Sequence, residues 1–289
     1  MENWKSEFKR CLLDTSRCYM IEKYIFKQPL WESQKLLLET IKNNKITVAV
    51  KSRSVGYTSI LAAFTACEIA LNCEKNNENR SAFGYYDIMY IAPNVCMGIE
   101  FRNLVLRFLE QIPTELWSDE IISLKQSITM RTNRQLMVNY ARLTISYDNK
   151  IIFSDTNSKY LHYVLYDEPV AGRDNVDIEK DIANCGYPQS INKVVVGGCS
   201  NHKNDSWFNF AKDTKSAGGY IEMPWWTSPK CRSDKSDEPI YMCDSDNLDG
   251  EYTNRWFRTM RELMGGDSDN FQDEFGAKVW KYKKVKECV

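Results

Sequence analysis

Four almost uninterrupted apolar runs constrain the fold of this chain more than any other feature. They are "ITVAV" (46–50), "YDIMYIAP" (86–93), "LHYVLYDEP" (161–169) and "NKVVVGGCS" (192–200). Segments with helical periodicity separate them. Continuous apolar strands that alternate with helices predict an α/β fold with a mostly parallel central sheet covered on both faces. Ligands of such sheets bind beyond the carboxyl ends of the strands.

The rest of the chain divides by pattern into further elements. Helical spacing predicts helices at residues 31–43, 58–72, 97–112 and 205–216. Short alternating runs between residues 126 and 154 predict antiparallel hairpin strands, with turns near Asn133 and Asn149. Two amphipathic or aromatic segments, around Phe8 and at 18–26, are predicted to pack against the core.

The texture changes after residue 205. A strand at 220–226, a polar loop to about residue 250, and helices at 251–264 and 270–280 are predicted there. We therefore expect two domains, a core at 1–204 and a small lid or linker subdomain at 205–289.

Composition excludes some classes of protein and leaves others open. The 289 residues include 38 basic and 39 acidic ones, so overall charge does not indicate a nucleic-acid partner. The sequence has no apolar run of membrane-spanning length and no signal-peptide pattern at its start, so we expect a cytosolic protein without a membrane partner. Ten scattered cysteines without a C-x-x-C pair predict reduced thiols rather than a zinc site.

The loop "KSRSVGYT" (51–58) has the setting of a phosphate-binding loop, between a strand and a helix. In the pattern G-x-x-x-x-G-K-[ST], backbone N–H groups surround phosphate, the lysine adds charge and the hydroxyl binds Mg²⁺. Gly56 matches the second glycine and Thr58 the hydroxyl, but Tyr57 stands at the lysine position. Lys51, at the loop entrance, has a side chain of about 6 Å that can reach the phosphates. Arg53 would add a planar donor group.

Two carboxylates, Asp167 and Glu168, end the third apolar run. A carboxylate at a strand tip can hold Mg²⁺, and its neighbour can orient and deprotonate an attacking water. The alternative is a solvated acidic turn before Pro169. At the end of the next strand, Gly198, Cys199 and Ser200 occupy the position that senses the γ-phosphate in motor ATPases.

Together these motifs resemble the large subunit of tailed-phage terminases, the motor that packages DNA. The segment before the loop resembles that family's adenine-contacting motif, with Gln34 at the adenine position. The loop is similar to the deviant Walker A of lambda-type terminases, in which the lysine stands at the loop's start and Gly-Tyr replaces Gly-Lys. "YVLYDE" resembles the Walker B strand with its catalytic glutamate, and "NFQDEFGAKVW" (270–280) resembles the signature that closes the ATPase region.

The resemblance implies a P-loop NTPase of the ASCE, RecA-like class that hydrolyses ATP with Mg²⁺. Glu168 and Arg53 are the expected catalytic residues, and Thr58 and Asp167 the Mg²⁺ ligands. Gly198, Cys199 and Ser200 form the expected coupling motif. The expected nucleotide contacts are Gln34, Lys51, Ser52, Arg53, Ser54, Val55, Gly56, Tyr57, Thr58 and Ser59.

The same resemblance implies partners and a setting. These are double-stranded viral DNA, a portal protein, the small terminase subunit and further copies of the chain in a ring, in the host cytoplasm. Arg131, Arg134 and Arg142 are candidates for an arginine finger that reaches a neighbouring subunit. The terminase nuclease domain has no room before Val289, so we expect an excised ATPase region rather than a shortened relative.

Two other functions stay open on the sequence. One is a helicase-like nucleic-acid translocase of the same ASCE class. The other is a nucleotide-binding assembly protein with little turnover, which the tyrosine in the lysine position makes reasonable.

Overall fold

The computed structural model describes residues 4–73, 86–117, 128–132, 135–138, 141–147, 160–169, 177–184, 191–199, 205–244 and 247–263. Its elements are α1 (Trp4–Leu13), α2 (Cys18–Met20), a π-helical segment (Ile21–Phe26), α3 (Glu32–Asn43), β1 (Ile46–Lys51), α4 (Tyr57–Asn72), β2 (Tyr86–Ala92), α5 (Val95–Leu109), a 3-10 turn (Thr114–Leu116), β3 (Ile128–Thr132), β4 (Gln135–Val138), β5 (Ala141–Tyr147), β6 (Leu161–Asp167), α6 (Ile178–Ala183), β7 (Ile191–Gly198), α7 (Asp205–Ser216), β8 (Tyr220–Met223), a 3-10 turn (Trp225–Thr227), β9 (Ile240–Asp244), β10 (Asn247–Thr253) and α8 (Arg255–Leu263).

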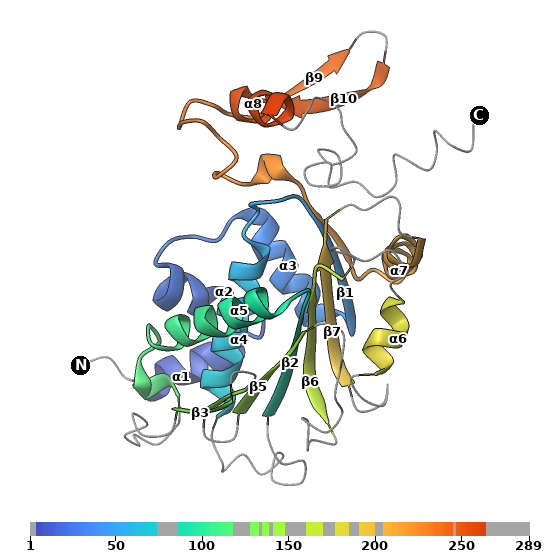
Figure 1. Ribbon diagram of the computed structural model, residues 1–289. Coiled ribbons are helices and arrows are strands. Elements are labelled where there is room, and N and C mark those ends of the chain that lie inside the picture. Colours follow the sequence, from blue (N-terminus) through green and yellow to red (C-terminus); the bar gives the residue numbers. More distant parts are fainter. Residues whose placement is uncertain are drawn as a thin grey trace.

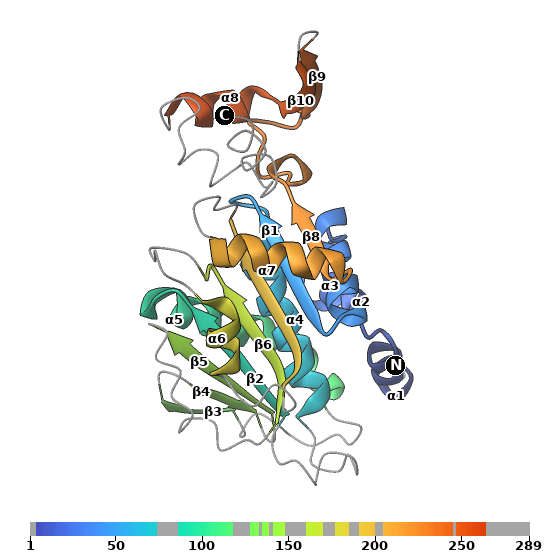
Figure 2. The same ribbon diagram turned by 90° about the vertical axis from the view of Figure 1, so that its right-hand side faces the viewer.

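A single eight-stranded sheet organises the molecule, in the order β3-β4-β5-β2-β6-β7-β1-β8. The strands from β5 to β8 in this order all run parallel, and β3 and β4 continue the sheet antiparallel at one edge. Helices cover both faces, with α3, α4 and α5 on one side and α6 and α7 on the other (Figures 1 and 2). The predicted α/β class with a mostly parallel sheet is confirmed.

The four apolar runs form the middle of this sheet because each strand is buried on both sides. Along β2, alternate side chains enter different clusters: Ile88 and Tyr90 join the cluster under α4 and α5, and Met89 and Ile91 join the cluster under α6 and α7. The helices predicted at 31–43, 58–72, 97–112 and 205–216 correspond to α3, α4, α5 and α7.

Helix α4 is the most deeply buried helix among the described residues, and the loop from β1 ends at its N-terminus. Every residue from Ile60 to Asn72 is buried, and the side chains are mostly small or aliphatic. Such a helix, apolar on all sides, belongs in the middle of a protein. It packs between the sheet, α3, α5 and the N-terminal segment.

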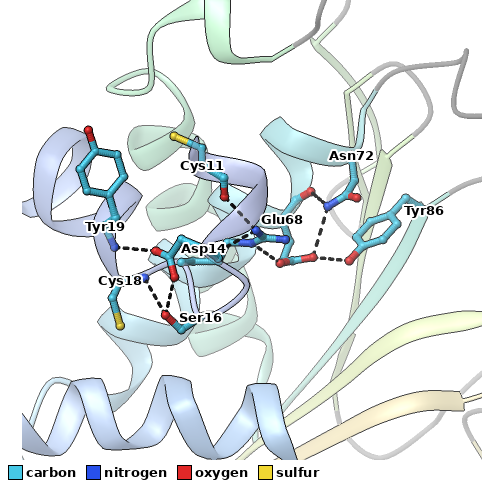
Figure 3. A network of polar contacts seen from close by, with 9 residues as sticks. Cys11, Asp14, Ser16, Cys18, Tyr19, Glu68, Asn72 and Tyr86 are labelled. Atoms are coloured by element: carbon cyan, nitrogen blue, oxygen red, sulfur yellow. Dashed lines mark hydrogen bonds and ion pairs between the residues drawn. The ribbon is translucent and has the colours of Figure 1, made fainter. Parts of the chain in front are cut away.

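The N-terminal segment is held to α4 by a buried ion pair. Arg17 Nε donates to Glu68 Oε1 at 2.6 Å, and Arg17 Nη1 donates to the carbonyls of Cys11 and Asp14. The other oxygen of Glu68 accepts from the Tyr86 hydroxyl and from Asn72 Nδ2 (Figure 3). Because every charge in this network has a partner, it can lie inside the protein.

One sequence expectation about the sheet is only partly right. The alternating runs do form the antiparallel strands β3, β4 and β5. However, β5 also pairs in parallel with β2 over its whole length, so it belongs to the central sheet rather than to an added hairpin. Its alternating sequence did not indicate this position. The predicted turns at Asn133 and Asn149 lie outside the described residues.

The C-terminal part differs more from expectation. Strand β8 ends at Met223 and pairs in parallel with β1, and α7 packs on the same sheet, so the sheet does not end at the proposed boundary of residue 204. Residues 240–244 and 247–253, within the predicted polar loop and at the start of the predicted helix 251–264, form the two-stranded sheet of β9 and β10, and α8 begins only at Arg255. The predicted helix at 270–280 lies outside the described residues.

Two further observations concern the described residues as a whole. None of their helices is both long and apolar enough to cross a membrane, and they contain no group of three or more metal-ligating side chains. The cysteines described as free thiols are Cys11, Cys18, Cys67, Cys73, Cys96, Cys199 and Cys231, of which Cys11, Cys67, Cys73 and Cys231 are buried.

The buried ion pair gives a test of how the N-terminal segment is anchored. Replacement of Glu68→Gln should lower the free energy of unfolding by about 3 kcal/mol, because Arg17 stays buried without a countercharge. Urea denaturation measures the loss. The matched control is Glu39→Gln, which removes an exposed pair with Lys42 and should cost less than about 0.5 kcal/mol. Equal losses in the two variants would contradict the anchoring role.

Candidate active site

Three neighbouring strands end at the same edge of the sheet and bring the predicted motifs together. Strands β6, β7 and β1 lie side by side, with Asp167 opposite Gly197 and Gly197 opposite Ala49. The loops that follow these strands therefore begin side by side at one edge of the sheet. This is the edge at which ligands of parallel sheets bind.

The loop between β1 and α4 has a fixed, unusual backbone. Ser54 (φ 63°) and Gly56 (φ 74°) both adopt the left-handed conformation, and Gly56 is the N-cap of α4. A Cβ on Gly56 would lie 2.7 Å from Gln34 Nε2, so a larger residue would have to displace the Gln34 amide, and the left-handed φ itself favours glycine. The Ser54 carbonyl accepts a 2.9 Å hydrogen bond from Ser228 Oγ.

The loop encloses a cavity of about 240 Å³ at the N-terminus of α4. Its lining consists of Lys51, Ser52, Ser54, Val55, Gly56, Tyr57, Thr58, Ser59 and Lys230. A helix N-terminus with free backbone N–H groups attracts anions. The cavity therefore combines a helix N-terminus, several hydroxyls and two lysines.

Lys51 is the central residue of the site. It ends β1, is 7% exposed, and forms an ion pair with the Glu168 carboxylate, with its Nζ 3.9 Å from Asp167 Oδ1. Burial disfavours its charged form, but the carboxylates of Glu168 and Asp167 outweigh this effect and raise the pKa of Lys51 above its ordinary value. Lys51 therefore stays protonated inside the protein.

Asp167 is fully buried at the end of β6. Its Oδ2 accepts hydrogen bonds from Thr58 Oγ1 at 2.8 Å and from the Tyr90 hydroxyl at 3.0 Å. Its Oδ1 has no hydrogen-bond partner among the described residues. Burial raises the pKa of Asp167, and Lys51 opposes that shift. The structure thus joins the hydroxyl of the loop to the carboxylate of the strand, as the motifs predict.

Glu168 turns sharply out of the strand. Its φ of 48° is left-handed, and its N–H donates to the Gly197 carbonyl at 2.7 Å. Its carboxylate accepts from Lys51, from the Cys199 N–H at 3.2 Å and from Cys199 Sγ at 3.5 Å. Burial acts to raise the pKa of Glu168, but Lys51 and the hydrogen bonds hold it below its ordinary value. The carboxylate is therefore ionised and already engaged.

Tyr57 stands at the lysine position of the loop pattern but has a packing role rather than a charge. Its ring is buried over Gly197, where a Cβ would lie only 2.0 Å from Tyr57 Cζ. The Lys51 ammonium lies 5.3 Å from the centre of the same ring, within the range of a cation–π interaction. Tyr57 therefore packs beneath Lys51, and Gly197 is what makes room for it.

Most predicted nucleotide-contacting residues gather at the cavity. Gln34 lies behind it, where its Oε1 accepts from the Trp31 N–H, and its side chain faces Gly56 rather than the cavity. Arg53 is exposed and is not among the lining residues. Gly198 lies close to Pro169 and Glu168, and Cys199 contacts Glu168 directly; Ser200 lies outside the described residues.

Three residues that contribute to the site were not predicted from the sequence. Tyr90, which contacts Asp167, looks like an ordinary core residue of an apolar strand. Ser228 and Lys230 lie in the segment after β8, which the sequence assigns to the C-terminal appendage. Ser228 and Lys230 reach the loop only because β8 pairs with β1, and the local sequence does not indicate this pairing.

One candidate for an arginine finger is ruled out. Arg142 is buried near the start of β5, away from the carboxyl edge of the sheet, and it makes two hydrogen bonds with Asp87 at 2.6 and 2.8 Å. It is therefore not available to a neighbouring subunit. The side chain of Arg131 and the whole of Arg134 lie outside what the structure describes.

The contact between Tyr57 and Gly197 can be tested by stability. Replacement of Gly197→Ala should cost about 2–3 kcal/mol of unfolding free energy, because the new methyl group overlaps the ring. The matched control, Gly198→Ala, meets Pro169 at 3.3 Å and should cost less. In a double-mutant cycle, Gly197→Ala combined with Tyr57→Ala should cost less than the sum of the single changes. Additive losses would mean that the ring does not lie over Gly197 in solution.

No family model matches the sequence, and no curated protein matches it significantly. The crystal structure of the HK97 bacteriophage large terminase superposes with a TM-score of 0.51 at 14% identity, covering 80% of this chain and 45% of that chain. The large terminase of a thermophilic bacteriophage, solved in complex with ADP, superposes with a TM-score of 0.51 at 8% identity, covering 87% of this chain and 54% of that chain.

A third structure, the large terminase ATPase domain of Thermus phage P74-26, superposes at 11% identity with a TM-score of 0.48, covering 88% of this chain and 95% of that domain. The chain spans about half the length of the HK97 terminase and of the ADP-bound terminase. At these identities, the comparison concerns the fold. Over most of its length, this chain has the α/β fold of the solved phage large terminases.

Proposed function

We propose that this chain is the ATPase motor domain of a viral terminase large subunit, which hydrolyses ATP to drive double-stranded DNA into a procapsid. The observation that carries the ATPase part is the ion pairing of Lys51, at the start of the phosphate-binding loop, with Asp167 at the end of β6 and with Glu168 just after it. A hydrogen bond from Thr58 to Asp167 joins the loop to the same strand. The fold, shared with phage large terminases, supports the assignment to packaging.

The residues present fit a bound nucleotide. The cavity lies at the N-terminus of a long buried helix, and hydroxyls and lysines line it. In the proposal, Ser52 to Ser59 surround the phosphates with backbone N–H groups, and Arg53 adds a donor from the loop's outer side. Gln34 contacts the adenine after a change of rotamer, because its side chain now faces Gly56.

The residues also fit Mg²⁺. Thr58 Oγ1 and Asp167 are 2.8 Å apart, and Asp167 Oδ1 is buried without a hydrogen-bond partner. Buried carboxylate oxygens normally accept hydrogen bonds, whereas this one has only the Lys51 ammonium at 3.9 Å, so it has capacity for a cation. Thr58 and Asp167 would hold the ion, which supplies charge neutralisation on the transferred phosphoryl group.

The ion pair between Lys51 and Glu168 suggests how turnover is controlled. Glu168 cannot act as a base toward water while Lys51 and Cys199 occupy its carboxylate. An entering triphosphate offers Lys51 a more highly charged partner, which releases Glu168 to hold and deprotonate the attacking water. The active site would therefore assemble only when ATP is present.

The step from hydrolysis to movement involves the end of β7 in this proposal. Cys199 touches the catalytic carboxylate through both its N–H and its sulfur. A change at Glu168 would thus reach Gly198, Cys199 and Ser200, the proposed coupling motif. Viral DNA, the portal protein, the small subunit and a ring of copies are the proposed partners, on the basis of the family resemblance.

Two rival functions make different predictions. A helicase-like translocase of the same class would separate DNA strands, whereas a packaging motor translocates without doing so and needs a portal. An assembly protein with little turnover would bind nucleotide but barely hydrolyse it. The ionised Glu168 carboxylate is paired with a lysine that lines the cavity, which supports turnover because it places a potential base close to the proposed phosphate site.

Two substitutions separate binding from chemistry. Lys51→Ala should weaken ATP binding about tenfold or more, because it removes a charge-assisted phosphate contact. Glu168→Gln should keep binding but lower phosphate release about 100-fold or more, because it removes the base. Calorimetric titration and a phosphate-release assay measure the two effects, on proteins whose folding is checked by circular dichroism.

The matched controls are Lys45→Ala, an exposed lysine before the same strand, and Glu179→Gln, an exposed glutamate of α6. Both should behave as wild type. Normal hydrolysis by Lys51→Ala would refute the displaced-lysine hypothesis, and normal turnover by Glu168→Gln would refute the assigned base. Nucleotide binding by wild type without any turnover would favour the assembly protein.

A further inference from the structure

A second lysine, Lys230, lines the cavity from the segment that follows β8. Of the nine lining residues that the structure describes, Lys51 and Lys230 are the two cations. The charge of Lys51 is already compensated by Glu168 and Asp167. Lys230 is exposed, and its ammonium has no ion-pair partner among the residues that the structure describes. It is therefore the uncompensated positive charge that this cavity offers to an anion.

Residues on both sides of Lys230 are anchored, and to different parts of the molecule. Ser228 is fully buried and its Oγ donates to the carbonyl of Ser54 in the phosphate-binding loop. Cys231 is also fully buried and packs in a small cluster with Trp225 and Phe257. Lys230 therefore lies between a residue fixed to the loop and a residue fixed to the C-terminal cluster.

The cluster is tied in turn to helix α8. The Cys231 carbonyl accepts a 2.9 Å hydrogen bond from Asn254 Nδ2, and Asn254 Oδ1 accepts from the Phe257 N–H at the start of α8. The rings of Trp225 and Phe257 stack with centroids 4.3 Å apart. A displacement of Lys230 would thus be transmitted through the next residue to the helix. Figure 1 shows α8, β9 and β10 beyond the carboxyl edge of the sheet.

We propose that Lys230 binds phosphate oxygens of the nucleotide and that this contact links nucleotide occupancy to the C-terminal segment that carries α8. The inference rests on the proposed function, since it takes the cavity to be a nucleotide site. It adds a phosphate-contacting residue outside the loop and both strand motifs. A lysine suits this role because its ammonium is a compact charge on a long, flexible chain.

The order of events follows from the two charges. Lys230 is exposed and uncompensated, so it meets an incoming polyphosphate without giving up a partner. Lys51 must first leave Glu168. The contact with Lys230 thus precedes the rearrangement of the catalytic carboxylate.

The binding part is tested with Lys230→Met, which keeps the length of the side chain and removes its charge. Affinities for ATP, ADP and adenosine are measured by calorimetry or competition. Lys230→Met should bind ATP and ADP about tenfold more weakly, with adenosine unchanged, and Lys230→Arg should recover most of the loss. The matched control is Lys235→Met, an exposed lysine of the same segment that does not line the cavity.

The link to α8 is tested by hydrogen exchange. Addition of ATP should protect the backbone at residues 225–231 and at the start of α8 in wild type and in Lys235→Met, but much less in Lys230→Met at matched site occupancy. Equal protection in all three proteins would overturn the link.

The outcomes of the binding test distinguish a failure of the Lys230 proposal from a failure of the proposed function. ATP affinity of Lys230→Met equal to that of wild type would overturn the role of Lys230 and leave the proposed function intact. An equal loss for ATP and adenosine would also overturn it, because a phosphate contact cannot affect adenosine. Failure of wild type to bind any nucleotide would overturn both.

Discussion

The buried ion pair of Lys51 with the carboxylates of β6 is the interaction on which this site depends. Asp167 and Glu168 end a strand that is buried on both faces, and two adjacent carboxylates in such a place would be strongly destabilising without a cation. Lys51 provides that cation from the neighbouring end of β1. The Lys51 ammonium that neutralises these buried carboxylates in the absence of a ligand is therefore also the cation that would bind a phosphate.

The position of Lys51 explains the tyrosine that follows Gly56. A lysine at position 57 would compete with Lys51 for the same carboxylates, and the two like charges would repel each other. Tyr57 instead fills the space above Gly197 and presents its ring to the ammonium of Lys51. Lys51 of β1, Tyr57 of α4 and Gly197 of β7 therefore depend on one another: the absence of a side chain at Gly197 makes room for the Tyr57 ring, and the ring packs against the Lys51 ammonium.

Sequence could predict the parts of the fold that carry their own signal. The apolar runs predicted four strands of the parallel sheet. Motif spacing also indicated a loop with Gly56 and Thr58 after β1 and a carboxylate pair, Asp167 and Glu168, at the end of the run that forms β6, and the hydrogen bond from Thr58 to Asp167 shows that the two segments meet. Strand β5 was assigned to a hairpin because its alternating pattern does not reveal that β2 is its second neighbour. Lys230 was missed for a similar reason. Its place at the cavity depends on β8 lying beside β1, and no local pattern encodes a pairing between strands more than 150 residues apart.

Under the proposed ATPase function, the energetics of the ion pair also bear on how the site would distinguish ATP from ADP. Breaking a buried pair exposes the remaining charge to an unfavourable environment, so Lys51 leaves Glu168 only for a partner that interacts at least as strongly. A triphosphate in the loop would bring more charge near Lys51 than a diphosphate, because it carries one more phosphoryl group. After hydrolysis and phosphate release, that partner is gone, and the pairing of Lys51 with Glu168 becomes favourable again. Because Lys51 can pair either with Glu168 or with the nucleotide phosphates, the Glu168 carboxylate would be released when a triphosphate is bound and paired again after phosphate is lost.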